Sequence, residues 1–253
     1  VVDGQERPLA ARFTFIGENT GQNATHFRDV NTDGLGPGMA RVAYTWRGSS
    51  AQDGAIELRP GAYRVVVSHG PEYTLHDQAL TVVAGAPTTL AIKLVKVIDS
   101  AGYVKADFHQ HGVNSPDANT PMKQRVITYL AADTEFVGSS DHDYLTDYAP
   151  VVASMGMADK LSTMIGVEST PFDYGHFNAF PLPYKANEPS RGAPDWGDGE
   201  NTNLSPGRLF AKFRELGAEV VQVNHAREEG ARRTPIAGFQ AYFDRAALSY
   251  DLE

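Results

Sequence analysis

The pattern of the chain changes once, near residue 101, and this change constrains the fold more than any other feature of the sequence. Up to Ile98, short alternating segments such as "ARFTFIG" and "MARVAYTWRG" are separated by Gly and Pro turns. Such spacing, without a helical period, is typical of a small β-sandwich. From Gly102, strand-like segments alternate with helix-like ones, which favours α/β architecture with a parallel sheet or barrel. We therefore expect a sandwich over residues 1–100 and an α/β domain over 101–253.

The strands of the first domain are marked by their turns. The segment "GAIELRPGAYRVVVSHG" predicts two strands joined at Arg59-Pro60-Gly61. The segment "ALTVVAGAPTTLAIKLVKV" predicts two more, broken at Gly85-Ala86-Pro87. Residues 17–38 are polar and glycine-rich, which indicates a long loop. The "LRPGAYRVVV" hairpin resembles the transthyretin-like, carboxypeptidase-regulatory type of sandwich.

The second domain reads as strands with two clear helices between them. The helix in "TPMKQRVITYLAAD" is predicted to have Thr120 as N-cap and Pro121 at its first position. The helix in "LSPGRLFAKFRELGA" is predicted to be capped by Ser205 and ended by Gly217. The expected strands are "YVKADFH", "TEFVGSSDHD", "LSTMIGVES", "HFNAFPL" and "EVVQVNHA". Residues 183–203, rich in Pro, Gly, Asn and Asp, are expected to be an insertion near the mouth of a site.

Charge and cysteine content exclude several kinds of site. The 253 residues carry a net charge of −9, which disfavours a nucleic-acid binder because phosphate neutralisation needs a basic surface. With no cysteine, the chain has no disulfide, no thiolate metal site and no cysteine nucleophile. No apolar run approaches membrane-spanning length, so no membrane span is expected. A small anionic substrate held at a metal stays compatible with this composition.

Histidines and acids recur where the predicted strands end. His109 and His111 are two residues apart on a strand, so both rings face the same side and can bind one ion. The later strand boundaries carry further residues of this kind: Asp141, His142, Asp143, Glu168, His176, Asn224 and His225. Because strand ends form the site in parallel α/β folds, these side chains are expected to converge. Imidazoles with carboxylates are a typical metal-ligand set.

Each of these residues also has an ordinary structural interpretation. His142 could cap a helix, Glu168 could pair with an arginine, and His176 could be a hydrogen-bonded core histidine. His225 could lie in a loop, and the pair His109 and His111 alone could lie on the surface. The coincidence of five histidines at successive strand boundaries favours the metal site.

A series of short motifs resembles the polymerase and histidinol phosphatase (PHP) superfamily. In order along the chain, the motifs are D-F-H-Q-H, Asp117, D-H, G-V-E, G-H-F-N-A-F and N-H. More narrowly, they resemble the branch named for carbaryl hydrolase, in which a β-module is similarly placed before the metal domain. The resemblance covers Val104 to the end of the chain, and more loosely the first hundred residues. It implies a distorted (β/α)7 barrel with a trinuclear metal site.

The resemblance also implies a role for each ligand. His109 and His111 would hold the first ion together with Glu168, and Glu168 would bridge to a second ion held by His176 and His225. Asp117 and His142 would hold a third. The family adds a late Asp-x-His motif, and none follows Arg227 here. We therefore expect that the chain stops before the final strands of such a barrel.

The catalytic residues expected from this arrangement are Glu168, Asp107, Asp141, Asn224 and Arg227. A water activated by the ions would lie around Glu168. Asp107 and Asp141 are expected to orient histidines through their free ring N–H groups, and Asp143 could do the same or be a loop residue. Asn224 could be an oxyanion donor or a turn residue, and Arg227 could bind an anionic substrate or lie on the surface. Two or three divalent ions are expected, of Zn, Mn or Fe.

These observations predict a metal-dependent hydrolase acting on a small-molecule phosphoester, ester or carbamate. The alternative is a non-catalytic, secreted binding module with a degenerate metal-binding barrel. A β-module before an enzyme favours a periplasmic or secreted location over a cytoplasmic one. The sequence does not determine the oligomeric state.

Overall fold

The computed structural model describes residues 1–17, 40–48, 54–58, 60–171, 174–197, 199 and 203–225. The chain forms two compact units. The first comprises Val1–Lys105 and Val126–Glu135, and the second comprises Ala106–Arg125 and the chain from Phe136 onward. The first unit thus continues past the predicted boundary at residue 100 and includes most of a helix from the second half of the sequence.

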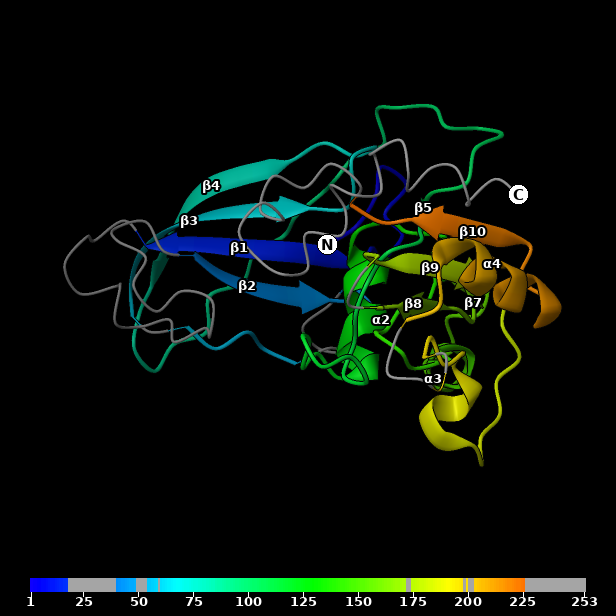
Figure 1. Cartoon of the computed structure of the whole chain (residues 1–253). Coiled ribbons are helices and arrows are strands. Elements are labelled where there is room, and N and C mark those ends of the chain that lie inside the picture. Colours follow the sequence, from blue (N-terminus) through cyan, green and yellow to red (C-terminus); the bar gives the residue numbers. More distant parts are fainter. Residues whose placement is uncertain are drawn as a thin grey trace. The chain divides into compact units, whose positions relative to one another are not determined.

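The first unit is built on a four-stranded antiparallel sheet (Figure 1). Its strands are β1 (Ala11–Gly17), β2 (Ala40–Thr45), β3 (Gly61–Ser68) and β4 (His76–Val82), in the order β2-β1-β3-β4. Alternate residues of β1 and β3 point to one face, as the period of two in their sequences predicts. That face forms a core with later residues, made of Ala11, Phe13, Phe15, Tyr63, Val65, Val67, Leu80, Ile92 and Leu94.

The predicted sandwich is not seen in the part of the chain that the structure describes, where the first unit has one sheet. Residues 54–58 form no strand, and the segment around residues 92–96 is held by single bridges, Val2 to Lys93 and Tyr73 to Lys96. Residue 59 and most of the predicted loop 17–38 lie outside the described residues. The strand predictions that hold are those with strict alternation, because alternation reports a half-buried face.

A buried charge network stabilises this first unit. Glu72 is 5% exposed, and its Oε2 atom lies 2.8 Å from Lys96 Nζ and 3.2 Å from Lys105 Nζ. Lys105 Nζ also lies 2.9 Å from Asp133 Oδ2. Hydrogen bonds from Lys96, Ser100 and Lys105 outweigh the effect of burial and lower the pKa of Glu72 to about 2. The ionised carboxylate is therefore stabilised in the folded state.

The Glu72→Gln substitution is expected to destabilise the protein by about 2 kcal/mol at pH 7, allowing for the exposure of Lys96. The folded pKa of Glu72, about 2, lies below its ordinary value of 4.5, so its contribution is complete above pH 4.5 and is lost as pH falls towards 2. Urea unfolding of both proteins should therefore differ at pH 7 and converge near pH 2. Glu57→Gln, at an exposed glutamate of the same unit, is the control; a difference independent of pH would contradict the assignment.

The second unit begins with a small parallel sheet. It consists of β5 (Ala106–Asp107), β6 (Phe136–Gly138) and β7 (Ser162–Met164), in that order. The helix α2 (Met122–Ala131) lies in sequence between β5 and β6, and α3 (Ala149–Ser154) between β6 and β7. The strand–helix alternation predicted for this stretch corresponds to these crossovers.

The (β/α)7 barrel predicted for the second domain is wrong. After β7, the strands β8 (Val167–Ser169), β9 (Phe177–Phe180) and β10 (Val220–Val223) form a separate antiparallel sheet in the order β10-β9-β8. Only residues 170–176 join β8 to β9, whereas a parallel crossover needs about a dozen residues or more. The described residues hold three short α-helices, too few to alternate with the strands of a barrel. The short 3₁₀ helix η2 (Pro189–Gly192) lies in the predicted insertion.

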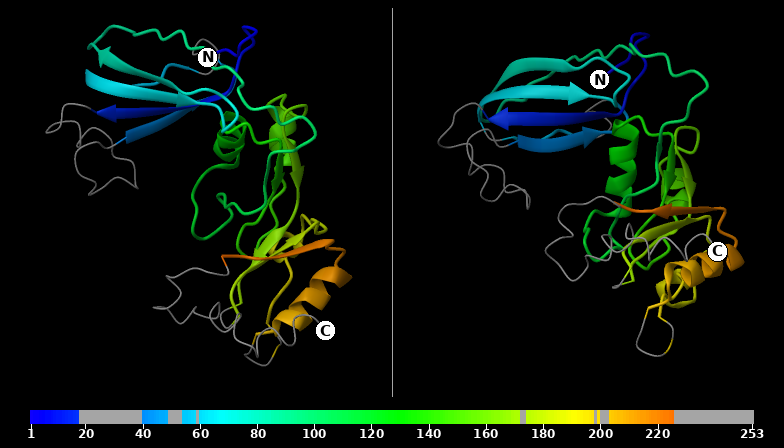
Figure 2. Two further views of the ribbon diagram at one scale, coloured as in Figure 1. Left: turned by 90° about the horizontal axis from the view of Figure 1, so that it is seen from above. Right: turned by 45° about the horizontal axis from the view of Figure 1, so that its top comes forward.

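The antiparallel sheet has an apolar face and a polar face, and this division positions the site. Val167, Phe177 and Ala179 share one core with Leu209 and Phe213 of the helix α4 (Pro206–Glu215). Figure 2 shows α4 beside this sheet in both views. Because side chains alternate along a strand, the residues between these apolar ones point to the opposite face. Ser205 is the N-cap of α4, as predicted, although its side chain makes no capping hydrogen bond.

Gly166 allows β8 to lie close to β9. A Cβ atom on this residue would lie 2.1 Å from Phe180 Cδ1 and 2.5 Å from the carbonyl oxygen of Ala179. Any side chain would therefore push the two strands apart just ahead of Glu168.

Among the described residues, no helix has the length and apolar character needed to cross a bilayer.

Candidate metal centre

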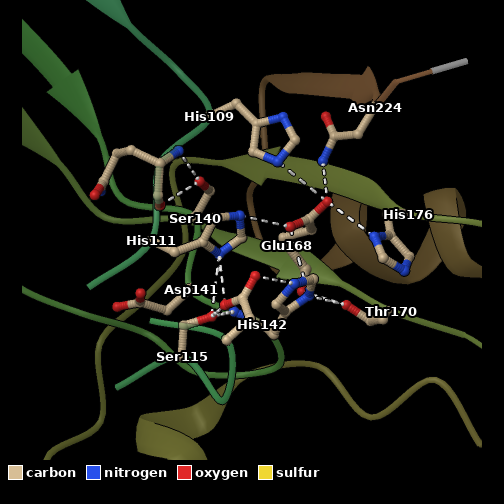
Figure 3. A network of polar contacts seen from close by, with 12 residues as sticks. His109, His111, Ser115, Ser140, Asp141, His142, Glu168, Thr170, His176 and Asn224 are labelled. Atoms are coloured by element: carbon tan, nitrogen blue, oxygen red, sulfur yellow. Dashed lines mark hydrogen bonds and ion pairs between the residues drawn. The ribbon is translucent and has the colours of Figure 1, made fainter. Parts of the chain in front are cut away.

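Glu168 is the centre of the polar face. It lies in the middle of β8, is fully buried, and receives histidine side chains from several segments of the second unit (Figure 3). All five histidines predicted to converge do so: His109, His111, His142, His176 and His225. Their side chains are 14–29% exposed, so the cluster is reached by solvent on the histidine side while the carboxylate is not.

The two oxygens of Glu168 face different groups. Oε1 lies 3.3 Å from His109 Nε2, 3.2 Å from His176 Nδ1 and 3.3 Å from His225 Nε2. Oε2 lies 3.2 Å from His111 Nε2 and 3.5 Å from His142 Nδ1. The carboxylate therefore divides the cluster into what we call the Oε1 side and the Oε2 side.

Asp117 extends the Oε2 side. Its Oδ2 atom lies 3.3 Å from His142 Nε2, and its Oδ1 atom lies 3.7 Å from His111 Nδ1. The hydroxyl of Ser115 donates a hydrogen bond to Asp117 Oδ1 at 2.7 Å. Asp117 is half exposed, unlike Glu168, so it closes the cluster towards solvent.

Two hydroxyl groups set the tautomers of the histidines on this side. Ser115 gives its hydrogen to Asp117, so at 3.0 Å it accepts from His111 Nδ1, which leaves His111 Nε2 to face Glu168. Thr170 donates to the carbonyl oxygen of Glu168 at 3.2 Å and so accepts from His142 Nδ1 at 2.6 Å. His142 Nε2 is then the lone-pair nitrogen and faces Asp117.

The histidines shift the pKa values of the groups that they surround. Burial would raise the pKa of Glu168, but the imidazoles of His109, His111, His176 and His225 beside its oxygens hold it far below its usual range. Burial opposes a charge on His111, yet the Glu168 carboxylate beside it raises its pKa. The pKa of His142 is lowered, first by burial and then by the neighbouring imidazoles. The Glu168 carboxylate thus favours a charge on His111, whereas burial disfavours one on His142.

The donor set fits a metal ion. Three groups have ligand atoms within 4.8 Å of one another: His109–His111–Glu168, His111–Asp117–His142 and His142–Glu168–His176. Two ligands, each about 2.1 Å from a tetrahedral ion, are about 3.4 Å apart. The distances from His109, His111, His176 and His225 to Glu168, 3.2–3.3 Å, agree with that spacing. These groups could hold a metal ion.

Hydrogen-bond capacity leads to the same conclusion. Glu168 Oε1 is approached by three imidazole nitrogens and by Asn224 Nδ2, although a carboxylate oxygen has about two lone-pair sites. Four donors cannot all bond to it, so imidazole lone pairs must also point inward. Oε2 is buried and accepts no hydrogen bond of good geometry from the described residues. A cation between these atoms would satisfy both oxygens.

Asp107 and Asp141 were predicted to orient histidine rings, and in the structure their hydrogen bonds go elsewhere. Asp107 Oδ1 accepts from the backbone N–H of His109 at 3.0 Å. Asp141 is fully buried and accepts from the backbone N–H of Gly112 at 2.6 Å and from the hydroxyl of Thr146. Both carboxylates thus fix the loop that carries the histidine pair through its backbone.

Asn224, which directly follows β10, lies inside the cluster and donates to Glu168 Oε1 at 2.7 Å.

Asp143, at φ 50°, accepts from the indole N–H of Trp196 at 3.0 Å and from the backbone N–H of Thr170 at 3.1 Å. Trp196 belongs to the predicted insertion, which therefore contacts the loop after His142. Arg227 lies outside the described residues.

Sequence reasoning assigned no role to Ser115, Thr170 or Asn178. Asn178 is fully buried, donates to the carbonyl oxygen of Phe108 at 2.7 Å, and accepts from Asn224. Its signal was an amide within the otherwise apolar strand "FNAF". Ser115 and Thr170 had no such signal, because serine and threonine near strand ends are common in turns.

Comparison of the chain with family models, with curated proteins and with solved structures gave no match. The chemistry of the cluster therefore has to be derived from its geometry.

Proposed function

We propose that the chain is a metal-dependent hydrolase of small-molecule phosphoesters, esters or carbamates. The observation that carries the proposal is the buried Glu168 with five imidazole nitrogens 3.2–3.5 Å from its two oxygens. A storage or structural site would be enclosed, whereas these histidines keep 14–29% of their side-chain surface exposed. The order of the residues along the chain, which resembles the PHP superfamily, also favours hydrolysis.

Each side of the cluster would hold an ion through its own residues. His109, His176 and His225 would bind on the Oε1 side, and His111, His142 and Asp117 on the Oε2 side, with Glu168 contacting both. Divalent ions in such a site supply a Lewis acid for the substrate oxygen and lower the pKa of water. Nitrogen and oxygen ligands without a thiolate favour zinc, manganese or iron.

The chain's own groups would then orient the substrate and control protons. Asp117 is half exposed and bonded to Ser115, so it is the carboxylate best placed to accept a proton from an attacking water. Glu168 is unsuited to this role, because it is fully buried and both of its oxygens face imidazole nitrogens. Buried Asp141 and partly exposed Asp107 would keep the His109–His111 loop in place during turnover.

Metal content and hydrolysis measured on the same preparation test the proposal. The purified chain, incubated with zinc or manganese and desalted, should retain at least one ion per chain by elemental analysis. It should also hydrolyse p-nitrophenyl phosphate or a naphthyl ester or carbamate, and a chelator should abolish that activity. Ion binding without turnover of any of these substrates would instead favour the non-catalytic binding module. A chain that retains no ion would contradict the proposed hydrolase.

A further inference from the structure

A row of amide side chains leads away from Glu168 across the antiparallel sheet. In the strand register, Glu168 of β8 is directly opposite Asn178 of β9, and Asn178 is directly opposite Gln222 of β10. Directly opposed side chains lie on the same face of a sheet, and Asn224 follows Gln222 by two positions. The polar face of the sheet therefore carries one carboxylate and three amides in contact.

The hydrogen bonds of these amides have one consistent direction. Asn224 Nδ2 donates to Glu168 Oε1 at 2.7 Å and to Asn178 Oδ1 at 2.7 Å. Asn178 Nδ2 donates to the carbonyl oxygen of Phe108 at 2.7 Å. Gln222 Nε2 donates to Asn224 Oδ1 at 2.9 Å. Because ionised Glu168 can only accept, Asn224 must present its NH₂ group, and this choice fixes the orientation of Asn178.

The pair of asparagines also reaches the backbone that carries ligands of the Oε1 side, through the side chain of Asn178 and the main chain of Asn224. Phe108 immediately precedes His109, so the bond from Asn178 anchors the segment that holds this histidine. The backbone N–H of Asn224 donates to the carbonyl oxygen of His176 at 3.1 Å, and His225 follows Asn224 directly. The side chain of Asn178 thus anchors the segment of His109, whereas the main chain of Asn224 links the segments of His176 and His225.

The two asparagine side chains of this arrangement are buried, and burying an amide has a free-energy cost. Asn178 is fully buried and Asn224 is 1% exposed. Burying an amide costs free energy unless its hydrogen bonds are made, and apolar residues of similar size would fill these positions without that cost. Phe177 and Ala179, on either side of Asn178, already supply the core. Packing therefore does not explain the two asparagines.

We propose that Asn178 and Asn224 form an amide relay that positions Glu168 and the segment of His109 for metal binding. This inference rests on the proposed function, since it assumes that the centre binds ions. The relay gives Asn224 a positioning role in place of the oxyanion donor or turn residue expected from the sequence. Its counterpart on the Oε2 side is the pair of hydroxyls, Ser115 and Thr170.

The test is a double-mutant cycle with Asn178→Leu, Asn224→Leu and the double variant, read out as zinc affinity by competition with a chelating dye. Each single substitution should weaken binding about 10- to 100-fold, as for other residues that orient metal ligands. The double variant should bind no more than about two-fold more weakly than the weaker single variant, because either change breaks the same relay. If the leucine variants fail to fold, Asn178→Ser replaces them. The serine side chain is too short to reach both Asn224 and the carbonyl oxygen of Phe108, so this variant should show the same loss of zinc affinity.

Phe213→Leu is the matched control, because Phe213 lies in the core on the opposite face of the same sheet. It should lower the melting temperature and leave zinc affinity unchanged, whereas the asparagine variants should change affinity. Two results would overturn the relay but not the proposed function. In the first, the wild type binds zinc and each single variant binds it with an affinity within two-fold of wild type. In the second, the affinity losses of the two single variants multiply in the double variant. A wild-type chain that binds no zinc overturns the proposed function and the relay together.

Discussion

The Glu168→Gln variant is expected to bind zinc or manganese more than about 100-fold more weakly than the wild type and to lose hydrolytic activity. The loss should exceed the 10- to 100-fold effect of changing a residue that only orients ligands. Glutamine has nearly the same shape but lacks the negative charge, and both oxygens of Glu168 face imidazole nitrogens at 3.2–3.5 Å. One substitution therefore affects both sides of the centre. Elemental analysis of desalted protein and a dye-competition titration would measure the effect.

Folding and metal binding can be separated in this experiment. Glu215 is an exposed glutamate of α4 in the same unit, and Glu215→Gln should bind ions as the wild type does. The far-ultraviolet circular dichroism of Glu168→Gln should match that of the wild type, since the amide fills the same space. If Glu168→Gln retained its ions at wild-type affinity, Glu168 could not be the shared ligand and the centre would lie elsewhere.

The residues of the cluster were predictable because metal chemistry restricts them to a few types. Histidines and acids at strand boundaries, in a chain without cysteine, pointed to His109, His111, His142, Glu168, His176 and His225, and the structure brings these six together. Their convergence did not depend on the predicted barrel, because the antiparallel sheet also brings His176, just before β9, and His225, just after β10, within 3.3 Å of Glu168.

The fold after β7 was not predictable from alternation alone. The segments "LSTMIGVES" and "HFNAFPL" read as strands, but strand content does not say whether neighbours run parallel or antiparallel. The short connection over residues 170–176 was the informative feature, since it leaves no room for a crossover helix. The ends of α4 were more predictable than the pairing of the strands, because Ser205 and Pro206 mark its start and Gly217 follows its end.

Supporting groups were harder to infer because their role depends on register. Asn178 matters because it is opposite both Glu168 and Gln222, and the sequence does not specify that pairing. Asp107 and Asp141 were identified as supporting residues, but their actual partners are the backbone N–H groups of His109 and Gly112. Such a bond depends on how the loop folds back, which residue types alone do not determine.

Saturating zinc or manganese is expected to raise the melting temperature of the wild-type chain by about 10 °C at pH 7.5. An ion that binds only the folded state contributes about 4 kcal/mol at 1,000 times its dissociation constant. For a chain of this length, 1 kcal/mol corresponds to about 2–4 °C. The shift should shrink as the pH falls, because protons compete with the metal ion for the imidazole nitrogens.

The His111→Ala variant should lose most of this stabilisation, because His111 belongs to two of the three ligand groups and faces Glu168 Oε2 at 3.2 Å. His76→Ala, in β4 of the other unit, removes a histidine that pairs with Gln78 and should keep the full shift. Differential scanning calorimetry with and without a chelator gives the measurement. An equal shift in His111→Ala and wild type would mean that the stabilising ion binds outside the Glu168 cluster, since removing this ligand from two groups cannot leave binding there unchanged.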